Sequence, residues 1–341
     1  MPAPKKLLLD VLSHRKSKKK PIWLMRQAGR YLPEYRALRQ AKGGFLDLVY
    51  DPDAAAEITL QPVRRFGFDG AILFSDILVV PHALGQQLAF EAGEGPFLSP
   101  ALVDGALAGL ESDFGRFRSI FRTVEKVKAA LPGETTLLGF AGSPWTVATY
   151  MVAGRGSRDQ NEARRLAYRD PVAFAALTDA IVAASVHYLS GQVAAGVEAV
   201  QLFDSWAGNL APAQFEQWVI APTARIVAEL KAVHPAVPII GFPKGAGGKL
   251  AAYARETGVD AIGLDETVDP AWAAASLPAD LPVQGNLDPL ALIAGGEALV
   301  KAVARILSAF DDRPHVFNLG HGILPDTPIE HVEHLLRLVR K

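Results

Sequence analysis

Short apolar runs recur along the chain and alternate with longer stretches that are rich in alanine and leucine. The short runs have the length of buried strands, whereas the longer stretches have the length of helices. We expect eight strands, at residues 22–25, 70–74, 136–140, 199–203, 238–241, 261–264, 282–285 and 315–319. We expect helices between them, most clearly at Pro171–Ala195, 212–233 and 290–310.

This alternation of strands and helices predicts a parallel sheet. Eight strand–helix repeats would close a (β/α)8 TIM barrel, and an open doubly wound sheet is the alternative. No linker rich in serine, glycine or proline divides the chain, which favours a single domain. We therefore predict an α/β single-domain barrel over residues 21–341, preceded by a basic, mobile lead-in over residues 1–20.

Every predicted strand is followed by a polar or glycine-rich stop. The stops are Arg26, Ser75-Asp76, Ala141-Gly-Ser143, Asp204-Ser205, Phe242-Pro-Lys244, Asp265-Glu266, Asn286-Leu-Asp288 and Gly320-His321. In a barrel, the carboxyl ends of the strands converge on one mouth, where active sites lie. Polar turn residues commonly follow strands, and that explains about half of the pattern. The number of ionisable side chains among the stops still predicts an active site at the carboxyl ends of the strands.

The charge of the chain is nearly balanced. Among its 341 residues are 35 Lys and Arg and 36 Asp and Glu, giving a formal net charge of -1. Such a balance argues against a dedicated nucleic-acid-binding protein. The basic stretch 14–20 could suggest contact with nucleic acid or a membrane, but no aromatic residue interleaves its charges, so we favour a solvated lead-in.

The targeting signals point to a soluble protein. No signal peptide is evident, because the apolar run LLLDVL is short and is followed by charged residues. No apolar run reaches the length of a membrane span. We therefore expect a cytoplasmic protein that binds neither nucleic acid nor membranes.

Several common catalytic patterns are missing from the sequence. The chain contains no cysteine, which excludes disulfides, thiolate metal sites, Fe–S clusters and a cysteine nucleophile. It has no GxSxG hydrolase pattern and no GxGxxG loop for a dinucleotide. The EHVEH of residues 330–334 is not HExxH, and the glycines of residues 242–248 lack Walker spacing. We interpret them as a solvated helix face and a flexible loop.

Two arginines, Arg26 and Arg30, follow the first predicted strand and lie on either side of Gly29. Guanidinium groups at the end of a buried strand are costly unless they meet an anion. A planar guanidinium binds a carboxylate through two parallel hydrogen bonds, which a lysine cannot copy. The pair therefore indicates an anionic partner, and an internal salt bridge to Asp76 is one possibility.

Three long stretches together resemble the uroporphyrinogen decarboxylase family. They are PIWLMRQAGRYLPEY at residues 21–35, FSDILVVPHALG at 74–85 and GFAGSPWTVATYMVAG at 139–154, and shorter matches are QLFDSWAG at 201–208, QGNLDP at 284–289 and NLGHG at 318–322. The resemblance covers the chain from residue 21 onward. It implies a (β/α)8 barrel, usually a homodimer, that works without metal or cofactor. It also implies conversion of the four acetate side chains of uroporphyrinogen III to methyl groups, giving coproporphyrinogen III in haem biosynthesis.

The resemblance also implies the site residues. Its catalytic residues correspond to Asp76, Arg26, Arg30, Tyr150 and His321, and its substrate-binding residues to Arg26, Arg30, Asp76, Tyr150, Phe203, Ser205 and His321. Asp76 can accept hydrogen bonds from pyrrole N–H groups and stabilise the cationic ring that forms when a ring carbon is protonated. The structural alternatives are a core tyrosine at 150, a turn serine at 205 and a structural histidine at 321. The sequence leaves the proton donor open.

Two other classes of protein are compatible with parts of this pattern. Corrinoid-dependent methyltransferases share the barrel but hold zinc through cysteine and histidine, and the lack of cysteine disfavours them. A tetrapyrrole-binding carrier would keep the pocket residues and lose the chemistry, which the full set of matched polar residues disfavours. An assay for decarboxylation separates the carrier from the enzyme.

Overall fold

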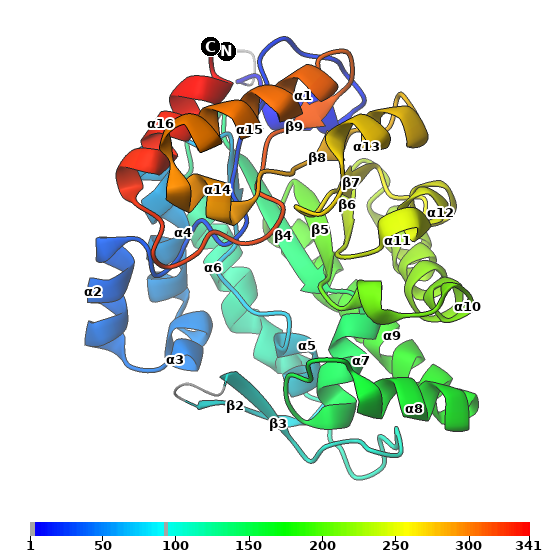
Figure 1. Ribbon diagram of the computed structural model, residues 1–341. Coiled ribbons are helices and arrows are strands. Elements are labelled where there is room, and N and C mark those ends of the chain that lie inside the picture. Colours follow the sequence, from blue (N-terminus) through cyan, green and yellow to red (C-terminus); the bar gives the residue numbers. More distant parts are fainter. Residues whose placement is uncertain (1–3, 92–94) are drawn as a thin grey trace.

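A curled parallel sheet of seven strands forms the centre of the molecule (Figure 1). In the computed structural model, which describes residues 4–91 and 95–341, the strand order is β1-β4-β5-β6-β7-β8-β9. The strands are β1 Gly70–Ile72, β4 Thr136–Gly142, β5 Ala199–Asp204, β6 Ile239–Pro243, β7 Ala261–Gly263, β8 Val283–Gln284 and β9 His315–Val316. All neighbouring pairs are parallel, which confirms seven of the eight predicted strands and the α/β fold class.

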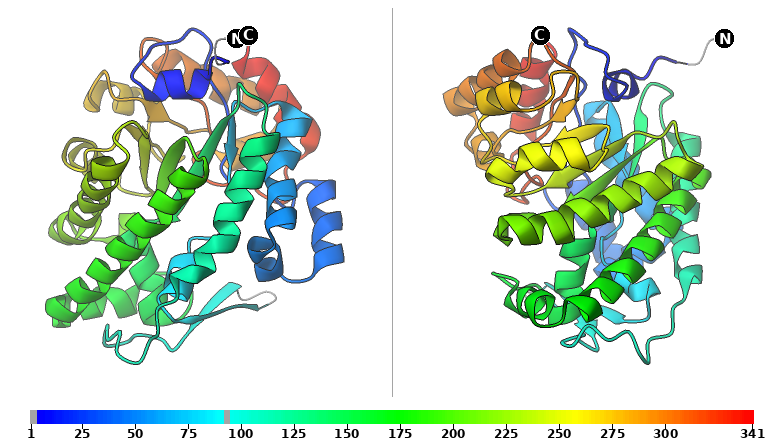
Figure 2. Two further views of the ribbon diagram at one scale, coloured as in Figure 1. Left: turned by 180° about the vertical axis from the view of Figure 1, so that it is seen from behind. Right: turned by 90° about the vertical axis from the view of Figure 1, so that its right-hand side faces the viewer.

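Helices surround this sheet, and the long helices α6 and α9 pack side by side on its outer face (Figure 2). The helices are α1 Leu7–Leu12, α2 Pro33–Lys42, α3 Phe45–Tyr50, α4 Pro52–Phe66, α5 Val79–Ala83, α6 Arg118–Ala130, α7 Pro144–Ala153, α8 Asn161–Arg169, α9 Pro171–Ala195, α10 Pro212–Phe215, α11 Ala221–Val233, α12 Leu250–Glu256, α13 Pro270–Ser276, α14 Pro289–Ala294, α15 Gly296–Ala309 and α16 Ile329–Val339. Short helical turns occur at Phe114–Phe117, Ala207–Asn209, Glu216–Ile220 and Gly247–Lys249.

The first predicted strand, at residues 22–25, is not a regular strand. Ile22 forms only an isolated parallel bridge to Phe317, next to β9. On its other side, the carbonyl of Ile22 accepts a hydrogen bond from Asp69 N at 2.9 Å, next to β1. This extended segment therefore fills the gap between β9 and β1 and closes the ring. The barrel thus has seven strands and one irregular extended segment, residues 22–25, which we call the irregular stave.

Side chains replace the ladder hydrogen bonds that this segment lacks. Leu24 N donates to Gln27 Oε1 at 3.0 Å, and Met25 N donates to Asn318 Oδ1 at 2.9 Å. A buried backbone N–H needs some partner, and an amide side chain satisfies it as well as a neighbouring strand does. Apolar periodicity cannot distinguish these two solutions, so the sequence predicts a strand at residues 22–25.

Two predicted helices are interrupted in the structure. The stretch 212–233 contains a π-helical turn at Glu216–Ile220 just before Pro222, which cannot donate a helical hydrogen bond. The stretch 290–310 breaks at Gly295, whose φ of 64° and ψ of -154° lie outside the helical region, into α14 and α15. An antiparallel hairpin, β2 Gln87–Glu91 with β3 Gly95–Ser99, was not predicted, because Gly95 and Pro96 obscure its strand pattern.

Helix α9 corrects the expectation that no apolar run is long enough to span a membrane. Among the described residues it is the one helix that is long and apolar enough by length and composition. Half of that stretch is buried, and α9 packs against α6, α7, α11 and β4. Its apolar surface is therefore used in packing against the rest of the barrel.

The expected boundary at residue 21 falls inside packed structure. Helix α1 buries Leu8, Val11 and Leu12 in the core. Lys20 is also buried, and its ammonium donates to the carbonyl oxygens of Phe310, Asp311 and Arg313, at 3.0 Å, 3.1 Å and 3.5 Å. Packing against the barrel therefore begins before residue 21, although the stretch between α1 and Lys20 is largely exposed, as a basic lead-in would be.

A layer of polar side chains crosses the barrel interior beneath the ends of the strands. Trp23 Nε1 donates to Gln284 Oε1 at 3.0 Å, and Gln284 Nε2 donates to Gln201 Oε1 at 2.9 Å. Gln201 Nε2 lies 3.7 Å from the Met25 sulfur. These contacts link the irregular stave to β5 and β8 and form the floor under the barrel mouth.

Candidate active site

Arg26 stands at the end of the irregular stave in a left-handed backbone conformation, with a φ of 60°. Its side chain lies against Gly322, where any Cβ atom would collide with it. The hydrogen bonds of Leu24 and Met25 to side-chain amides hold the chain directly before this turn. The contact of the Arg26 side chain with Gly322 therefore places the exposed guanidinium next to the loop that carries His321.

Asp76 lies in the loop that follows β1 and is half-buried. Its Oδ1 accepts a hydrogen bond from Leu78 N at 2.8 Å. Burial raises the pKa of this carboxyl, while the Leu78 hydrogen bond and the charge of Arg26 act in the opposite direction. In the described part of the chain neither Arg26 nor Arg30 forms an ion pair with Asp76. The alternative of an internal salt bridge is therefore not what the structure contains.

Tyr150, near the end of α7, adjoins both of these charges. Burial raises the pKa of its phenol, the charge of Asp76 raises it further, and the charge of Arg26 opposes this. Its ring lies 6.4 Å from that of Trp206, measured between centroids. Tyr150 is therefore a neutral hydroxyl group at neutral pH, and the charges of a carboxylate and a guanidinium act on it in opposite directions.

The carboxyl end of β5 supplies an apolar wall and a hydroxyl group. Phe203 packs edge-on against Phe140 and Phe242, with ring centroids 5.5 Å and 6.0 Å away. Successive side chains of a strand point to opposite faces, so Phe203 shares the inner side with Gln201, and the half-buried Ser205 follows directly after the strand. These residues form one side of the mouth above the polar floor.

Asp204 points to the other side of the same strand. It is fully buried, and Thr146 Oγ1 of α7 donates to its Oδ1 at 2.5 Å. Burial raises the pKa of Asp204 to about 7, against the effect of the Thr146 hydrogen bond. Although Asp204 follows the strand pattern of the other stops, it lies between the strand and the helices rather than in the mouth.

His321 follows β9 and is half-buried. Burial lowers its pKa to about 4, and the charges of Lys244 and Arg26 lower it too, while Asp265 opposes them. The imidazole is therefore neutral at neutral pH. Two cations flank it, which makes this part of the mouth suitable for a ligand carboxylate.

Lys244 and Glu266 belong to the mouth although the sequence did not single them out. Lys244 Nζ lies 3.5 Å from Glu266 Oε1, and both side chains are about one-quarter exposed. Asp265 Oδ2 accepts a hydrogen bond from Gly245 N at 2.7 Å, which fixes the loop that carries Lys244. Both residues follow directly after predicted strands, which indicates a place at the mouth. Polar turn residues commonly follow strands as well, so this position alone did not identify them as site residues.

Arg30 differs from the other predicted site residues. It is exposed, its backbone carbonyl accepts a hydrogen bond from Arg36, and its charge acts on Tyr35. Arg26, Asp76, Tyr150 and His321, by contrast, form one electrostatically connected group. The structure therefore places Arg30 beside α2 and does not bring it together with that group.

No group of three or more histidine, aspartate or glutamate side chains within residues 4–91 and 95–341 is arranged to hold a metal ion. The mouth instead combines cations, neutral hydroxyl groups and the half-buried carboxylates of Asp76 and Glu266 over an apolar wall. Together the fold and the site define a (β/α)8-barrel enzyme with cations and neutral hydrogen-bond donors at the carboxyl ends of its strands.

Comparison with known proteins identifies the family. The family model of uroporphyrinogen decarboxylase (URO-D) matches residues 3–341. Curated uroporphyrinogen decarboxylases of Sphingopyxis alaskensis and Rhizorhabdus wittichii are 72% and 71% identical over 340 residues, covering 100% of this chain and 99% of each relative. That of Novosphingobium aromaticivorans is 67% identical over the same length. The chain belongs to the uroporphyrinogen decarboxylase family.

The similar solved structures support the fold. A methyltransferase from Methanosarcina mazei superposes with a TM-score of 0.82 at 18% identity, covering 98% of this chain and 97% of that chain. A B12-independent methionine synthase from Shewanella superposes with a TM-score of 0.56 at 13% identity, covering 95% and 94% of the two chains. At these identities the likeness concerns the barrel alone.

Proposed function

We propose that this chain removes the carboxyl groups of the four acetate side chains of uroporphyrinogen III and yields coproporphyrinogen III. The observation that carries the assignment of the site is the half-buried Asp76 beside Arg26 and Tyr150 at the barrel mouth. Family membership supports the reaction, and this geometry supports the place where it occurs.

Breaking the carbon–carbon bond to CO2 leaves an electron pair, which needs an acceptor. Protonation of a pyrrole ring carbon creates a cationic ring that accepts this pair as CO2 leaves. A second proton then adds to the exocyclic carbon to form the methyl group, and the ring carbon returns its proton. The substrate ring itself is the electron acceptor, so this scheme involves neither a metal nor an organic cofactor.

Asp76 has two roles in this scheme. Its carboxylate accepts hydrogen bonds from the pyrrole N–H groups of the flexible macrocycle, since it offers several acceptor positions. The same negative charge stabilises the cationic ring. An interaction of this kind is stronger in the transition state than in the neutral ground state, which is what accelerates a reaction.

The surrounding side chains hold the substrate carboxylates. Arg26 binds one carboxylate through its planar guanidinium, and Arg30 approaches a second one from the edge of the mouth. The neutral donors Tyr150, Ser205 and His321 complete the carboxylate contacts, and Phe203 packs against the rings. Lys244, held by Glu266, adds a further cation on the His321 side.

The proton donor is best sought among groups that can reach the ring. An arginine that pairs with the departing carboxylate stabilises the ground state and slows the reaction. We therefore assign Arg26 to orienting a carboxylate that is retained and to relaying protons, where needed, through water. Tyr150 and His321 are the neutral groups on which the charge of Arg26 acts, and they are the candidates for the proton donor.

We also infer a cytoplasmic homodimer that binds neither nucleic acid nor membranes. The resemblance to the family supports the dimer, and the nearly balanced charge supports the lack of nucleic-acid binding. Sedimentation velocity on the purified chain tests the dimer. A species with the mass of one chain across micromolar concentrations contradicts it.

The reaction is tested by incubating the purified, chelator-treated protein anaerobically with uroporphyrinogen III and counting product carboxylates by chromatography. The expected product has lost four carboxyl groups without any added cofactor. Unchanged substrate overturns the proposal, and tight binding without carboxyl loss would indicate a tetrapyrrole carrier instead.

A further inference from the structure

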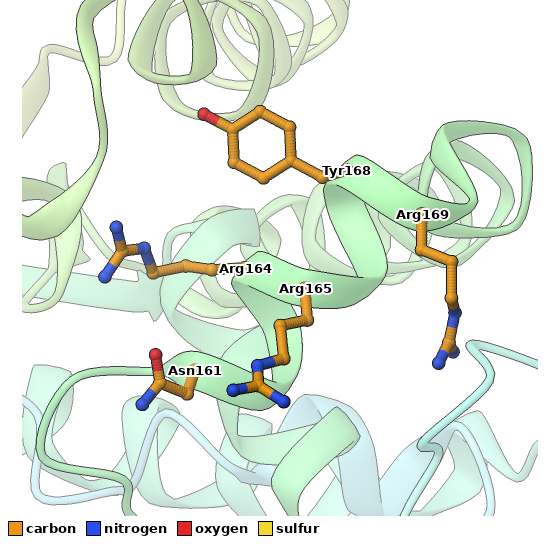
Figure 3. A pocket seen from close by; sticks show the side chains of 5 residues that line it. All are labelled: Asn161, Arg164, Arg165, Tyr168 and Arg169. Atoms are coloured by element: carbon orange, nitrogen blue, oxygen red, sulfur yellow. The ribbon is translucent and has the colours of Figure 1, made fainter.

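Helix α8 (Asn161–Arg169) carries an arginine-rich face outside the barrel mouth. The α8 arginine face consists of Arg164, Arg165, Tyr168 and Arg169, which together with Asn161 line an open pocket of about 570 Å³ (Figure 3). This volume lies within the range of small-molecule pockets, about 300–1,000 Å³. Figure 3 shows the five side chains projecting from this one helix, with Arg165 and Arg169 directed the same way.

The three guanidinium groups of this face have no carboxylate partner. In residues 4–91 and 95–341, no acidic oxygen lies within ion-pair distance of Arg164, Arg165 or Arg169, whereas several other surface arginines are ion-paired. Arg164 and Arg169 donate only to the backbone carbonyls of Asp159, at 3.5 Å, and Val103, at 3.2 Å. Their positive charge therefore remains available to an anion from solution.

An aromatic side chain lies among these charges. Tyr168 is 63% exposed, more than the exposed aromatic residues Phe97 and Trp272. A flat, partly apolar ligand can pack on such a ring while its charged groups meet the neighbouring guanidinium groups. The face therefore combines the two features that a ring bearing carboxylates requires.

The loop before α8 joins this face to the mouth. Gln160 directly precedes α8, and its Oε1 accepts a hydrogen bond from Asn209 Nδ2 at 2.5 Å. Asn209 belongs to the loop that follows β5 and carries Ser205. Gly156, in the segment between α7 and α8, lies against the ring of Tyr150. The α8 arginine face is therefore anchored to both loops that line one side of the mouth.

We propose that the α8 arginine face is an outer capture site for polycarboxylate tetrapyrroles, which it binds before they enter the barrel mouth. The inference rests on the proposed function for the identity of the ligand. The substrate carries carboxylates around pyrrolic rings, and each partly decarboxylated intermediate still carries more than four. The chain as a whole has a net charge of only -1, so a local cluster decides where a polyanion approaches.

The capture site acts on association rather than on bond breaking. A surface field of this kind raises association rates by roughly 10-fold to 1,000-fold at low ionic strength, and salt removes the effect. Three charges on one short helix justify the lower end of this range. The site also slows the escape of intermediates, so its loss allows partly decarboxylated products to accumulate in solution.

The test uses stopped-flow binding of uroporphyrin, the oxidised and fluorescent octacarboxylate, which is not turned over. The variant Arg164→Gln/Arg165→Gln/Arg169→Gln is expected to associate roughly tenfold more slowly at low salt and like the parent at high salt. Tyr168→Ala is expected to shorten the bound lifetime without a change in salt dependence. If the triple variant does not fold, Arg165→Gln reports the same effect at a smaller size.

The matched control removes three other exposed arginines that have no ion-pair partner among the described residues, as Arg122→Gln/Arg255→Gln/Arg337→Gln. Equal slowing in both triple variants overturns the capture site, because net charge alone then explains the rates. Loss of self-association in the α8 variant, measured by sedimentation, also overturns it and assigns the face to a contact between copies. Turnover of uroporphyrinogen by the parent protein, measured separately, tests the proposed function independently.

Discussion

Replacing Asp76 with asparagine tests the charge at the centre of the site. The asparagine oxygen can still accept the hydrogen bond from Leu78 N, which is 2.8 Å long in the parent, so the loop conformation is expected to survive. What is lost is the negative charge beside the cationic ring. Two opposite charges about 4 Å apart at an effective dielectric constant of about 20 interact by roughly 4 kcal/mol. When this interaction acts only in the transition state, its loss lowers kcat by roughly a thousandfold.

The assay is single-turnover loss of the first carboxyl group under anaerobic conditions, with circular dichroism and thermal unfolding as checks on the fold. Asp204→Asn is the matched control, because Asp204 is a second buried carboxyl near the same strands that faces the helices. We expect parental turnover in Asp204→Asn. Turnover within about threefold of the parent in Asp76→Asn, a change of less than about 1 kcal/mol, would refute the cation-stabilising role.

The pH dependence of the parent adds a second test of the same residue. Burial raises the pKa of Asp76, so the carboxylate becomes protonated at a higher pH than an exposed aspartate does. The single-turnover rate is therefore expected to fall on the acid side as pH drops through this raised pKa. Asp76→Asn should lack that acid limb, whereas an acid limb of unchanged midpoint in the variant assigns it to another group.

Three further predictions concern the rim of the mouth and the fold. Lys244→Met should raise KM by roughly tenfold with kcat kept, and it should raise the pKa of His321 above about 4 in an NMR titration, because a flanking cation is gone; an unchanged histidine titration contradicts this. Arg30→Lys should raise KM by roughly tenfold without lowering stability, since lysine cannot form the bidentate pair; unchanged KM assigns Arg30 to structure. Glu198 has a lowered pKa, because hydrogen bonds from Lys128 and Lys6 and from Leu137 N outweigh burial, which raises it. Its stabilisation is therefore present above the unfolded-state pKa and is lost as pH falls through the folded-state pKa. Urea unfolding should show Glu198→Gln less stable by about 1 kcal/mol at neutral pH and equal to the parent in acid; a constant difference contradicts this.

The fold could be predicted because buried strands and helices leave apolar stretches of different length in the sequence. Helix Pro171–Ala195 was predicted with its observed bounds, since Asp170 caps it and Gly196 follows its end. The irregular stave at residues 22–25 could not be predicted as such. Its hydrogen bonds go to Gln27 and Asn318, and the second of these lies far away in the sequence.

The site was predicted in its residue types and only partly in its geometry. The left-handed turn at Arg26 depends on the contact with Gly322, which no local pattern contains. Lys244 and Glu266 stood among the strand ends, yet their pairing depends on two different strands being neighbours in the sheet. Asp204 satisfied the same pattern and lies on the wrong side of β5, because one residue along a strand reverses the face.

The most direct test of the account is complete turnover of uroporphyrinogen III by the metal- and cofactor-free protein in D2O, followed by mass spectrometry and NMR of the product. The proposed decarboxylation gives a product with four lost carboxyl groups, four retained propionates and one solvent-derived deuterium on each new methyl group. Unchanged uroporphyrinogen, or carboxyl loss that requires an added metal or cofactor, would contradict it.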